Sequence, residues 1–396
     1  MALLQLSDVA HQLPRGDADF LRSRVADLLE RRNMSFPGAQ PVSFARKHFQ
    51  DLLMTDYFVC EKTDGIRCLL FLTFYIEEGN KVEAKILIDR KNDYYNIDNM
   101  HFHLPLPDAP DASFHTETLL DGELVLDKLP NGDERKTYLV FDCLALENKS
   151  LLQRTLDKRL AYFMESVLKP YQSLLERYPE EVPEQPFLVM PKKMEKAYGI
   201  EMMFKDVLPK LPHGNDGLIF TCRTSPYVTG TDQHIIKWKP PHENTIDFRL
   251  QLGDFPMVEE GGERFQDFDA CPSFELLVYH GNNRNEYFAP LYLTESEWES
   301  MKGMGQMLDG RIIECAKDDK GRWRMKREAD GTPRFRDDKT EANHIKTVES
   351  VLESIEDAVT ETDLLNNVKP IYIQWKRRAA EATEKAKQAS APTNGR

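Results

Sequence analysis

The sequence predicts an α+β protein built from two domains. Its 396 residues exceed the roughly 100–200 residues of a typical domain. Short apolar runs broken by Asp-Gly, Asn-Gly and Pro turns fill two long stretches and indicate strands. Between the halves, the segment Pro240–Asn244 favours neither helix nor strand, because successive prolines fix φ and remove hydrogen-bond donors. We take it as the domain boundary.

The first domain is predicted to span residues 1–240 and to open with an amphipathic helix from Asp17 to Arg32. Its apolar face is expected to carry Phe20, Leu21, Val25, Leu28 and Leu29. Strands follow between Tyr57 and Phe141. A second helical stripe is then predicted on Leu156, Leu160, Phe163, Met164 and Val167, ahead of further strands from Phe187 to Trp238.

The second domain, residues 241–343, is expected to be a small antiparallel β structure. Its strands are predicted at Thr245–Leu252, Phe274–Tyr279, Ile312–Ala316 and Trp323–Arg327. A five-stranded barrel of the OB-fold type fits this length. Helical spacing of apolar residues from His344 to Val359 predicts a closing helix. We expect residues 344–375 to pack back on the first domain and residues 376–396 to form a fraying helix and a disordered tail.

Composition narrows the class of protein. Hydrophobic residues make up 41% and charged residues 30% of the chain, and no apolar run reaches the roughly 18 residues that span a bilayer. The N-terminus lacks the pattern of a secretory leader. The six cysteines are scattered without C-x-x-C pairs, which indicates buried apolar residues in a reducing compartment. A net charge of −14 argues against coating nucleic acid, so any nucleotide contact must be local.

The most informative segment is Glu61-Lys62-Thr63-Asp64-Gly65-Ile66-Arg67. It sets Lys62 just before an Asp-Gly turn between two apolar runs, so the lysine is expected at a strand–turn–strand junction facing a cleft. A lysine becomes a nucleophile when its pKa is lowered by partial desolvation or by nearby cations. A surface lysine in a hairpin would give the same short pattern. Other motifs in the chain must therefore decide whether Lys62 is a nucleophile or a surface residue.

Two further Asp-Gly pairs, Asp121-Gly122-Glu123 and Asp216-Gly217, are predicted to form similar turns, although each could be a plain hairpin. In Ile235-Ile236-Lys237-Trp238-Lys239, strand alternation would send Lys237 and Lys239 to one face. That face is either solvated or shared with Lys62. If it is shared, the cations would neutralise phosphates while Glu123 and Asp216 hold a divalent metal, a combination suited to phosphoryl transfer.

The run Arg334–Lys339 lies far along the chain from Lys62. An exposed charge run is its ordinary interpretation. The functional one is a clamp that domain closure brings to a leaving pyrophosphate.

Together these motifs resemble the covalent nucleotidyltransferases, the superfamily of mRNA guanylyltransferases and ATP-dependent ligases. The ordered set is Lys62–Arg67, Asp121–Glu123, Tyr138–Asp142, Asp216–Phe220, Lys237–Pro240 and Arg336–Lys339. Within the superfamily, Lys-Thr-Asp-Gly-Ile-Arg and the last box are similar to the mRNA capping guanylyltransferases of the single-function fungal type, over about residues 37–365.

The resemblance implies a catalytic nucleotidyltransferase domain followed by an OB-fold domain, with Lys62 forming a lysyl–GMP intermediate from GTP. It places Arg67 and Glu123 at the ribose, with Glu123 and Asp216 available to Mg²⁺ or Mn²⁺. Phe141 would stack on guanine and Lys192 would meet its edge. Contacts to the α-phosphate are implied for Lys237 and Lys239, and Arg336, Asp338 and Lys339 would orient the β- and γ-phosphates. Arg90 would add a phosphate or ribose contact, and Glu61 is counted among the nucleotide-binding residues.

It also implies partners and a location. The acceptor would be the 5′-diphosphate end of nascent RNA, and the protein would act in the nucleus with the phosphorylated C-terminal tail of RNA polymerase II. Because the chain has no His-Cys-x5-Arg phosphatase loop, a separate RNA 5′-triphosphatase is expected. An ATP-dependent polynucleotide ligase and a non-catalytic scaffold with the same fold are the alternatives.

Overall fold

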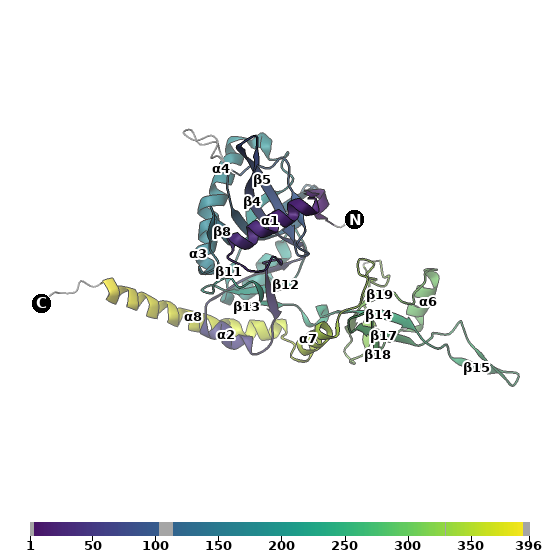
Figure 1. Ribbon diagram of the computed structural model, residues 1–396. Coiled ribbons are helices and arrows are strands. Elements are labelled where there is room, and N and C mark those ends of the chain that lie inside the picture. Colours follow the sequence, from purple (N-terminus) through teal and green to yellow (C-terminus); the bar gives the residue numbers. More distant parts are fainter. Residues whose placement is uncertain (1–3, 103–113, 329, 391–396) are drawn as a thin grey trace. The chain divides into compact units, whose positions relative to one another are not determined.

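The structure, a computed structural model, describes residues 4–102, 114–328 and 330–390. The chain forms two compact units (Figure 1). The first comprises Met1–Trp238 together with Glu361–Arg396, and the second comprises Lys239–Thr360. The first segment of the first unit therefore ends at Trp238, slightly before the predicted boundary. The chain then forms the second unit and returns to the first unit at Glu361.

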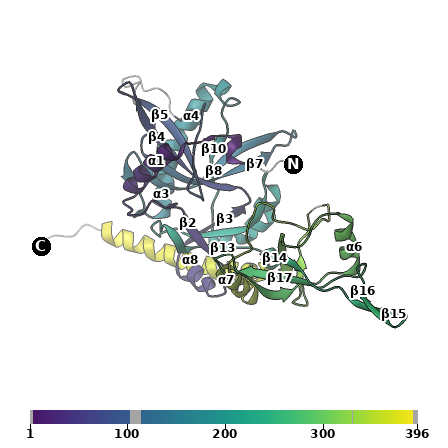
Figure 2. The same ribbon diagram turned by 45° about the vertical axis from the view of Figure 1, so that its right-hand side comes forward.

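A larger, mostly antiparallel sheet forms the part of the first unit that is uppermost in Figure 2. Its strand order is β1-β6-β5-β4-β7-β8-β10, with β9 paired with β8. Its strands are β1 (His11–Gln12), β4 (Ile66–Glu77), β5 (Asn80–Asp89), β6 (Tyr94–Asn96), β7 (Thr118–Lys128), β8 (Glu134–Leu146), β9 (Lys149–Ser150) and β10 (Leu188–Pro191).

A smaller sheet lies below it in the same unit (Figure 2), with strand order β11-β3-β12-β13-β2. These strands are β2 (Ala39–Ser43), β3 (Tyr57–Thr63), β11 (Glu195–Lys196), β12 (Asn215–Cys222) and β13 (Gly230–Trp238). Only the residue pair Asp64-Gly65 separates β3 from β4, so the chain passes from the small sheet to the large one directly after Lys62.

Both faces of the larger sheet are buried. Leu70 and Leu72 of β4 belong to one apolar core and Leu69 and Phe71 to another, since successive strand residues face opposite ways. The helices α1 (Arg15–Leu28), α3 (Leu156–Phe163) and α4 (Lys169–Arg177), with a π-helical turn at Met164–Leu168 between the last two, supply the covering residues. Burial on both sides explains why β4 reads as one continuous apolar run.

In the first unit, the predicted helical faces are buried or partly buried except at two positions, although α1 spans Arg15–Leu28 and not the predicted Asp17 to Arg32. Phe20 is 63% exposed, because the buried stripe of α1 runs through Leu21, Val25 and Leu28 and position 20 lies to one side of it. Met164 is likewise exposed where the π-helical turn shifts the helical phase, whereas Phe163 and Val167 are buried.

The C-terminal region corrects the predicted segment 344–375. Helix α7 (Ile345–Glu356) packs Val348 into the core of the second unit. Helix α8 (Glu361–Ser390) belongs to the first unit, where it buries Leu364 and Ile371 and packs on α2 (His48–Met54). Residues 376–390, where a fraying helix and a disordered tail were predicted, continue α8 as a regular helix; residues 391–396 lie outside the described residues.

The second unit contains a five-stranded sheet in the order β18-β17-β14-β19-β20. The strands are β14 (Ile246–Leu252), β17 (Phe274–Tyr279), β18 (Asn285–Pro290), β19 (Ile312–Lys317) and β20 (Trp323–Met325). A bridge between Leu291 and Trp323 joins the two edges, with a 2.9 Å bond from the Tyr292 N–H to the Trp323 carbonyl. The sheet is therefore closed into the predicted five-stranded barrel.

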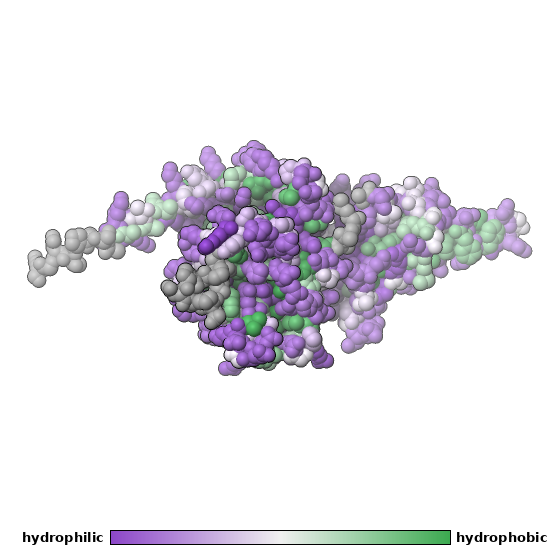
Figure 3. Space-filling view, turned by 90° about the horizontal axis from the view of Figure 1, so that it is seen from above, coloured by the Kyte–Doolittle hydropathy of each residue, from purple (hydrophilic) through white to green (hydrophobic). Residues whose placement is uncertain are grey.

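The sequence did not reveal β18 or the hairpin of β15 (Met257–Glu260) and β16 (Glu263–Gln266), whose strands are polar or exposed. Helix α6 (Glu295–Gly303) packs Trp298 and Met301 against the barrel core. The hairpin carries exposed Met257 and Phe265, and its hydrophobic surface stands out at the right of Figure 3 against an otherwise mainly hydrophilic face.

All six cysteines are free; five are buried and Cys271 is partly buried. Burial raises the pKa of the Cys60 thiol to about 12, so it behaves as an apolar residue, as predicted. Among the described residues, no helix is both long and apolar enough to cross a membrane.

Candidate active site

Lys62 lies one residue before the end of β3, and its Nζ is 2.6 Å from Oδ1 of Asp216 on β12. The register pairs Glu61 with Leu218 and Thr63 with Asn215, so two residues of β12 stand opposite Lys62. This is a β-bulge, and Gly217 takes its positive φ of 144° there. The predicted Asp216-Gly217 turn is therefore wrong: the pair bulges inside a strand, which aims the Asp216 carboxylate at Lys62.

The Asp121-Gly122 pair also lies inside a strand, β7, and not in a turn as predicted. A Cβ on Gly122 would come within 2.5 Å of the Tyr138 ring and 2.8 Å of the Leu139 carbonyl oxygen. Glycine thus lets the two strands approach closely at an irregularity between β7 and β8. The neighbouring carboxylate, Glu123, accepts a 3.3 Å hydrogen bond from the Gly65 N–H.

A second lysine lies beside this pair of strands. Lys192 follows β10; its side chain is only 3% exposed, and its ammonium group is hydrogen-bonded to the Thr63 hydroxyl. Its Nζ lies 3.5 Å from Glu61 and 3.9 Å from Glu123. Burial raises the pKa of Glu123, and the charges of Lys192 and Lys62 oppose that rise. The structure therefore gathers two lysines and three carboxylates, those of Glu61, Glu123 and Asp216, around the end of β3.

Arg67 is held away from solvent. Its Nε and one terminal nitrogen donate hydrogen bonds of 3.1 and 2.7 Å to the two carboxylate oxygens of Asp121. The other terminal nitrogen donates a hydrogen bond to the Ala39 carbonyl. Although burial alone would lower the pKa of Arg67, Asp121 raises it above its usual range. The guanidinium also lies 5.5 Å from the centre of the Phe141 ring. Arg67 thus braces the aromatic residue expected to stack on a base.

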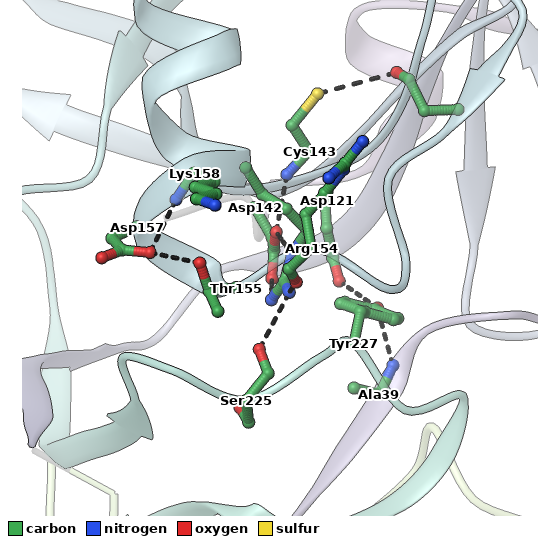
Figure 4. Close-up of polar contacts among 12 residues, drawn as sticks. Ala39, Asp121, Asp142, Cys143, Arg154, Thr155, Asp157, Lys158, Ser225 and Tyr227 are labelled. Carbon is green, nitrogen blue, oxygen red and sulfur yellow. Dashed lines mark hydrogen bonds and ion pairs between the residues drawn. The ribbon is translucent and has the colours of Figure 1, made fainter. Parts of the chain in front are cut away.

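Tyr227 completes this support. Its hydroxyl donates a 2.6 Å hydrogen bond to the fully buried Asp121 and accepts one of 2.8 Å from the Ala39 N–H (Figure 4). Directly after Phe141, Asp142 binds the buried Arg159 through both oxygens at 2.7 and 2.8 Å. The Phe141 ring therefore lies beside the Arg67–Asp121 ion pair, and the chain directly after it is anchored by a buried ion pair.

The register also places Lys237. It pairs with Ile219 of β12, which pairs with Cys60 of β3. Directly paired residues face the same way, and Lys62 lies two residues after Cys60, so Lys237 shares a face with Lys62. The expectation for Lys239 rested on a longer strand, but β13 ends at Trp238 and Lys239 begins the second unit.

Arg90 follows β5 and donates a 3.0 Å hydrogen bond to Gln40. Burial and the charge of Arg67 lower its pKa. The structure thus keeps a second guanidinium beside that of Arg67 in the first unit.

In the second unit, the predicted cations converge on one carboxylate. Arg336 binds Asp247 at 3.2 Å and Asp338 at 2.9 Å, and Lys339 also binds Asp247. Hydrogen bonding to Asp338 raises the pKa of Arg336 beyond its usual range. Both cationic side chains are about 30% exposed, whereas the Asp247 side chain is only 7% exposed. These cations are therefore accessible but already partnered.

Sequence reasoning missed Asp121 as the partner of Arg67, as well as Tyr227, His213, Asp127 and Asp247. The signal at Asp247 is weak, because its carboxylate stands at one of the alternating polar positions of the strand Ile246–Leu252, together with Arg249 and Gln251. Buried charged residues are rare unless they are paired. Tyr227 and His213 lie in loops, where composition gives no comparable signal.

Comparison with known families identifies the relatives of this chain. The model for the mRNA capping enzyme catalytic domain matches residues 7–241, and that for the mRNA capping enzyme C-terminal domain matches residues 243–365. A Neurospora crassa relative called mRNA-capping enzyme subunit alpha is 49% identical, with 96% of each chain covered. Relatives of the same name from Schizosaccharomyces pombe and Saccharomyces cerevisiae are 46% and 38% identical, covering 94% and 87% of this chain and 90% and 81% of theirs.

Among solved structures, a mycobacterial DNA ligase D complexed with ATP and MES is 17% identical, with a TM-score of 0.33, over 76% of this chain and 94% of that one. A similarity this low adds nothing to the assignment. The family matches and the paired lysine define the protein as a nucleotidyltransferase enzyme. Its two units correspond in order to the two family models. The chain belongs to the mRNA capping enzyme family.

Proposed function

We propose that the protein forms the mRNA 5′ cap by transferring GMP from GTP to the 5′-diphosphate end of RNA. The main support for this proposal is the position of Lys62, which is hydrogen-bonded to Asp216 at the end of a strand and lies near the buried cation Lys192. Membership of the capping enzyme family supplies the substrate class.

In the first step, the Lys62 Nζ loses a proton and attacks the α-phosphorus of GTP. A P–N bond forms, the bond to the bridging oxygen breaks, and pyrophosphate leaves. Asp216, the carboxylate 2.6 Å from Nζ, is positioned to receive the proton. In the second step, a terminal β-phosphate oxygen of the RNA attacks the same phosphorus. The P–N bond then breaks, which releases GpppN-RNA and restores Lys62.

The first unit supplies the proposed nucleotide contacts. The Phe141 ring, braced by Arg67, would stack on guanine. Lys192 and Thr63, already in contact with each other, would face the edge of the base. Arg67 and Glu123 would lie at the ribose. Lys237 would meet the α-phosphate, because its strand register puts it on the face of Lys62.

Further phosphate contacts are proposed for Arg90, Lys239, Arg336, Asp338 and Lys339. The second unit's cations would act on the β- and γ-phosphates in the first step only, since pyrophosphate has left before RNA reacts. For that role Arg336 and Lys339 must exchange Asp247 for phosphate, which their partial exposure allows.

Glu123 and Asp216 fit a magnesium or manganese ion. Their donors are hard carboxylate oxygens, and such ions are commonly held by one or two carboxylates together with substrate phosphates. The described residues contain no cluster of three or more potential protein ligands, so phosphate oxygens would complete the coordination. When bound, the ion would neutralise charge developing on the phosphates.

The partners proposed from the family are a separate RNA 5′-triphosphatase and the phosphorylated C-terminal tail of RNA polymerase II, with the nucleus as the location. The fungal relatives support a partner protein in one respect, because their names describe each as a subunit. Co-purification of the full-length protein with each candidate tests these proposals.

The decisive experiment incubates the protein with α-labelled GTP or ATP and magnesium and measures label that survives denaturation. We expect label from GTP that pyrophosphate removes and that Lys62→Ala lacks. Label from ATP alone would indicate a ligase instead. Absence of label from both nucleotides would leave a non-catalytic scaffold.

A further inference from the structure

Five charged side chains of alternating sign form a continuous row in the first unit. The row, called the charge row below, runs in the order Glu123, Lys192, Glu61, His213, Asp127. The nitrogen–oxygen distances between successive side chains are 3.9, 3.5, 3.7 and 2.8 Å. Glu61 directly precedes Lys62 on β3, so the row reaches the nucleophile's own strand. Its His213 end plays no role in the proposed chemistry.

His213 is anchored at one ring nitrogen only. Its Nδ1 lies 2.8 Å from Asp127, which also accepts a 2.7 Å hydrogen bond from the Thr137 hydroxyl and pairs with Arg135. The side chain is 7% exposed, and its buried Nε2 has no hydrogen-bond partner among the described residues. That nitrogen is aimed at Glu61, 3.7 Å away. An unsatisfied buried donor beside a carboxylate needs an explanation.

Glu61 lies between two cations and is too far from either for a short hydrogen bond. Lys192 is at 3.5 Å and His213 at 3.7 Å, on either side of a carboxylate that is 5% exposed. If Lys192 turns toward a nucleotide base, it weakens its pairing with Glu61. A buried carboxylate without a partner is costly, so nucleotide binding would be penalised unless a second cation replaced the lysine.

We infer that His213 is a positioning residue that takes over the Glu61 carboxylate when Lys192 turns to the nucleotide base. The inference rests on the proposed function, in which Lys192 meets the edge of guanine. A movement of less than 1 Å would bring Glu61 and the His213 Nε2 from 3.7 Å to an ordinary hydrogen-bond distance of about 2.9 Å. His213 itself touches neither nucleotide nor phosphate.

The charge of the imidazole suits this role. Burial lowers the pKa of His213, but Asp127 and Glu61 outweigh that effect and raise it to about 9. The ring is therefore protonated at neutral pH, and both nitrogens donate. The other charged groups near it are Lys192, beyond Glu61, and Arg135, beyond Asp127.

The test measures formation of the covalent GMP adduct by the full-length protein as a function of GTP concentration. For His213→Ala we expect the half-saturating GTP concentration to rise about tenfold, since a buried charge loses its replacement partner. The rate at saturating GTP should change less than about twofold, because the reacting atoms are untouched. A merely structural role would lower the saturating rate or the folded fraction instead.

Two further variants test whether the effect is specific to the charged imidazole of His213. His213→Gln keeps an amide donor, and we expect about a threefold rise because neutral hydrogen bonds are weaker than charged ones. It also serves if His213→Ala does not fold. The matched control is His234→Gln, which changes a half-exposed histidine paired with Asp232 and should leave adduct formation unaltered.

A double-mutant cycle isolates the exchange of partners. In a Glu61→Gln background there is no charge to take over, so His213→Ala should add less than about a twofold effect. A full tenfold effect in that background would overturn the inference, as would an unchanged GTP dependence in the single variant.

If the unaltered protein formed no adduct with GTP, both the proposed function and the role of His213 would be wrong. If only the role of His213 is wrong, the unaltered protein still forms the adduct.

Discussion

The two clusters of cationic residues differ in how they are held. Around Lys62, partners come from parts of the chain distant in the sequence: Lys62 bonds Asp216, 154 residues away, and the neighbouring Lys192 and Glu61 side chains are only 3% and 5% exposed. In the second unit, Arg336 bonds the exposed Asp338, two residues away, and shares the buried Asp247 with Lys339. The first cluster is therefore the more deeply buried, whereas the cations of the second share one carboxylate at the surface and can exchange it for another anion.

This difference matches the tasks proposed for each cluster. A nucleophile must be presented in one geometry through both steps, which favours preorganisation. Groups that act on pyrophosphate must bind it and then release it. Partial exposure and an internal carboxylate, Asp247, suit such reversible neutralisation.

The largest expected effect is at the nucleophile. Lys62→Arg keeps a cation opposite Asp216 but removes the amine, since arginine does not lose its proton. Adduct formation from labelled GTP should fall to background while the thermal unfolding midpoint stays close to that of the unaltered protein. Residual adduct in this variant would show that another residue is the acceptor.

Stability should separate buried from exposed pairs. Arg159→Ala leaves Asp142 buried without its partner and should cost about 3–5 kcal/mol of unfolding free energy. Arg264→Ala, which removes a highly exposed pair with Glu259 in the second unit, should cost less than about 1 kcal/mol. Urea denaturation measures both, and similar costs would contradict the contrast.

The clamp role separates the two chemical steps. Arg336→Ala and Lys339→Ala should each slow adduct formation from GTP about 100-fold, a typical loss for one charge-stabilising group. Transfer from preformed adduct to 5′-diphosphate RNA should be spared, because pyrophosphate has already left. Arg334→Ala, two residues from Arg336 and paired with Glu328, is the control. Equal loss of both steps would refute the clamp.

The smallest effect concerns pH. The pKa of His213 is raised to about 9 from an unfolded value near 6.5. Its contribution to stability is therefore fully present below about pH 6.5 and lost as the pH rises through about 9. Unfolding free energy should fall more steeply from pH 7 to 9.5 in the unaltered protein than in His213→Gln. Parallel curves would show that the histidine is not protonated in the fold.

The sequence predicted much of this arrangement, because strand periodicity and motif order are local properties. The strand–turn–strand setting of Lys62 is confirmed, and so are the barrel strands other than β18. By contrast, Asp121-Gly122 and Asp216-Gly217 lie inside strands. Asp-Gly favours turns and bulges alike, and only pairing with β8 and β3 decides between them.

Partners across the fold were the other failure. No pattern in the chain pairs Arg67 with Asp121 and Tyr227, or His213 with Asp127, because such contacts depend on which strands become neighbours. The same holds for the C-terminal helices. The apolar spacing of α7 was visible in the sequence and no such stripe was predicted for α8, and which of the two helices packs on the first unit depends on where the chain returns to it.

That return has a consequence for synthesis on the ribosome. The first unit needs α8, which buries Leu364 and Ile371 and ties Arg378 to Asp56 by bonds of 2.7 and 2.9 Å. The second unit is continuous in sequence and emerges earlier than α8, so it can fold while the first unit still lacks its last helix. A nascent chain stopped at Thr360 would present an unfinished first unit to chaperones, although every residue of the charge row had already been translated.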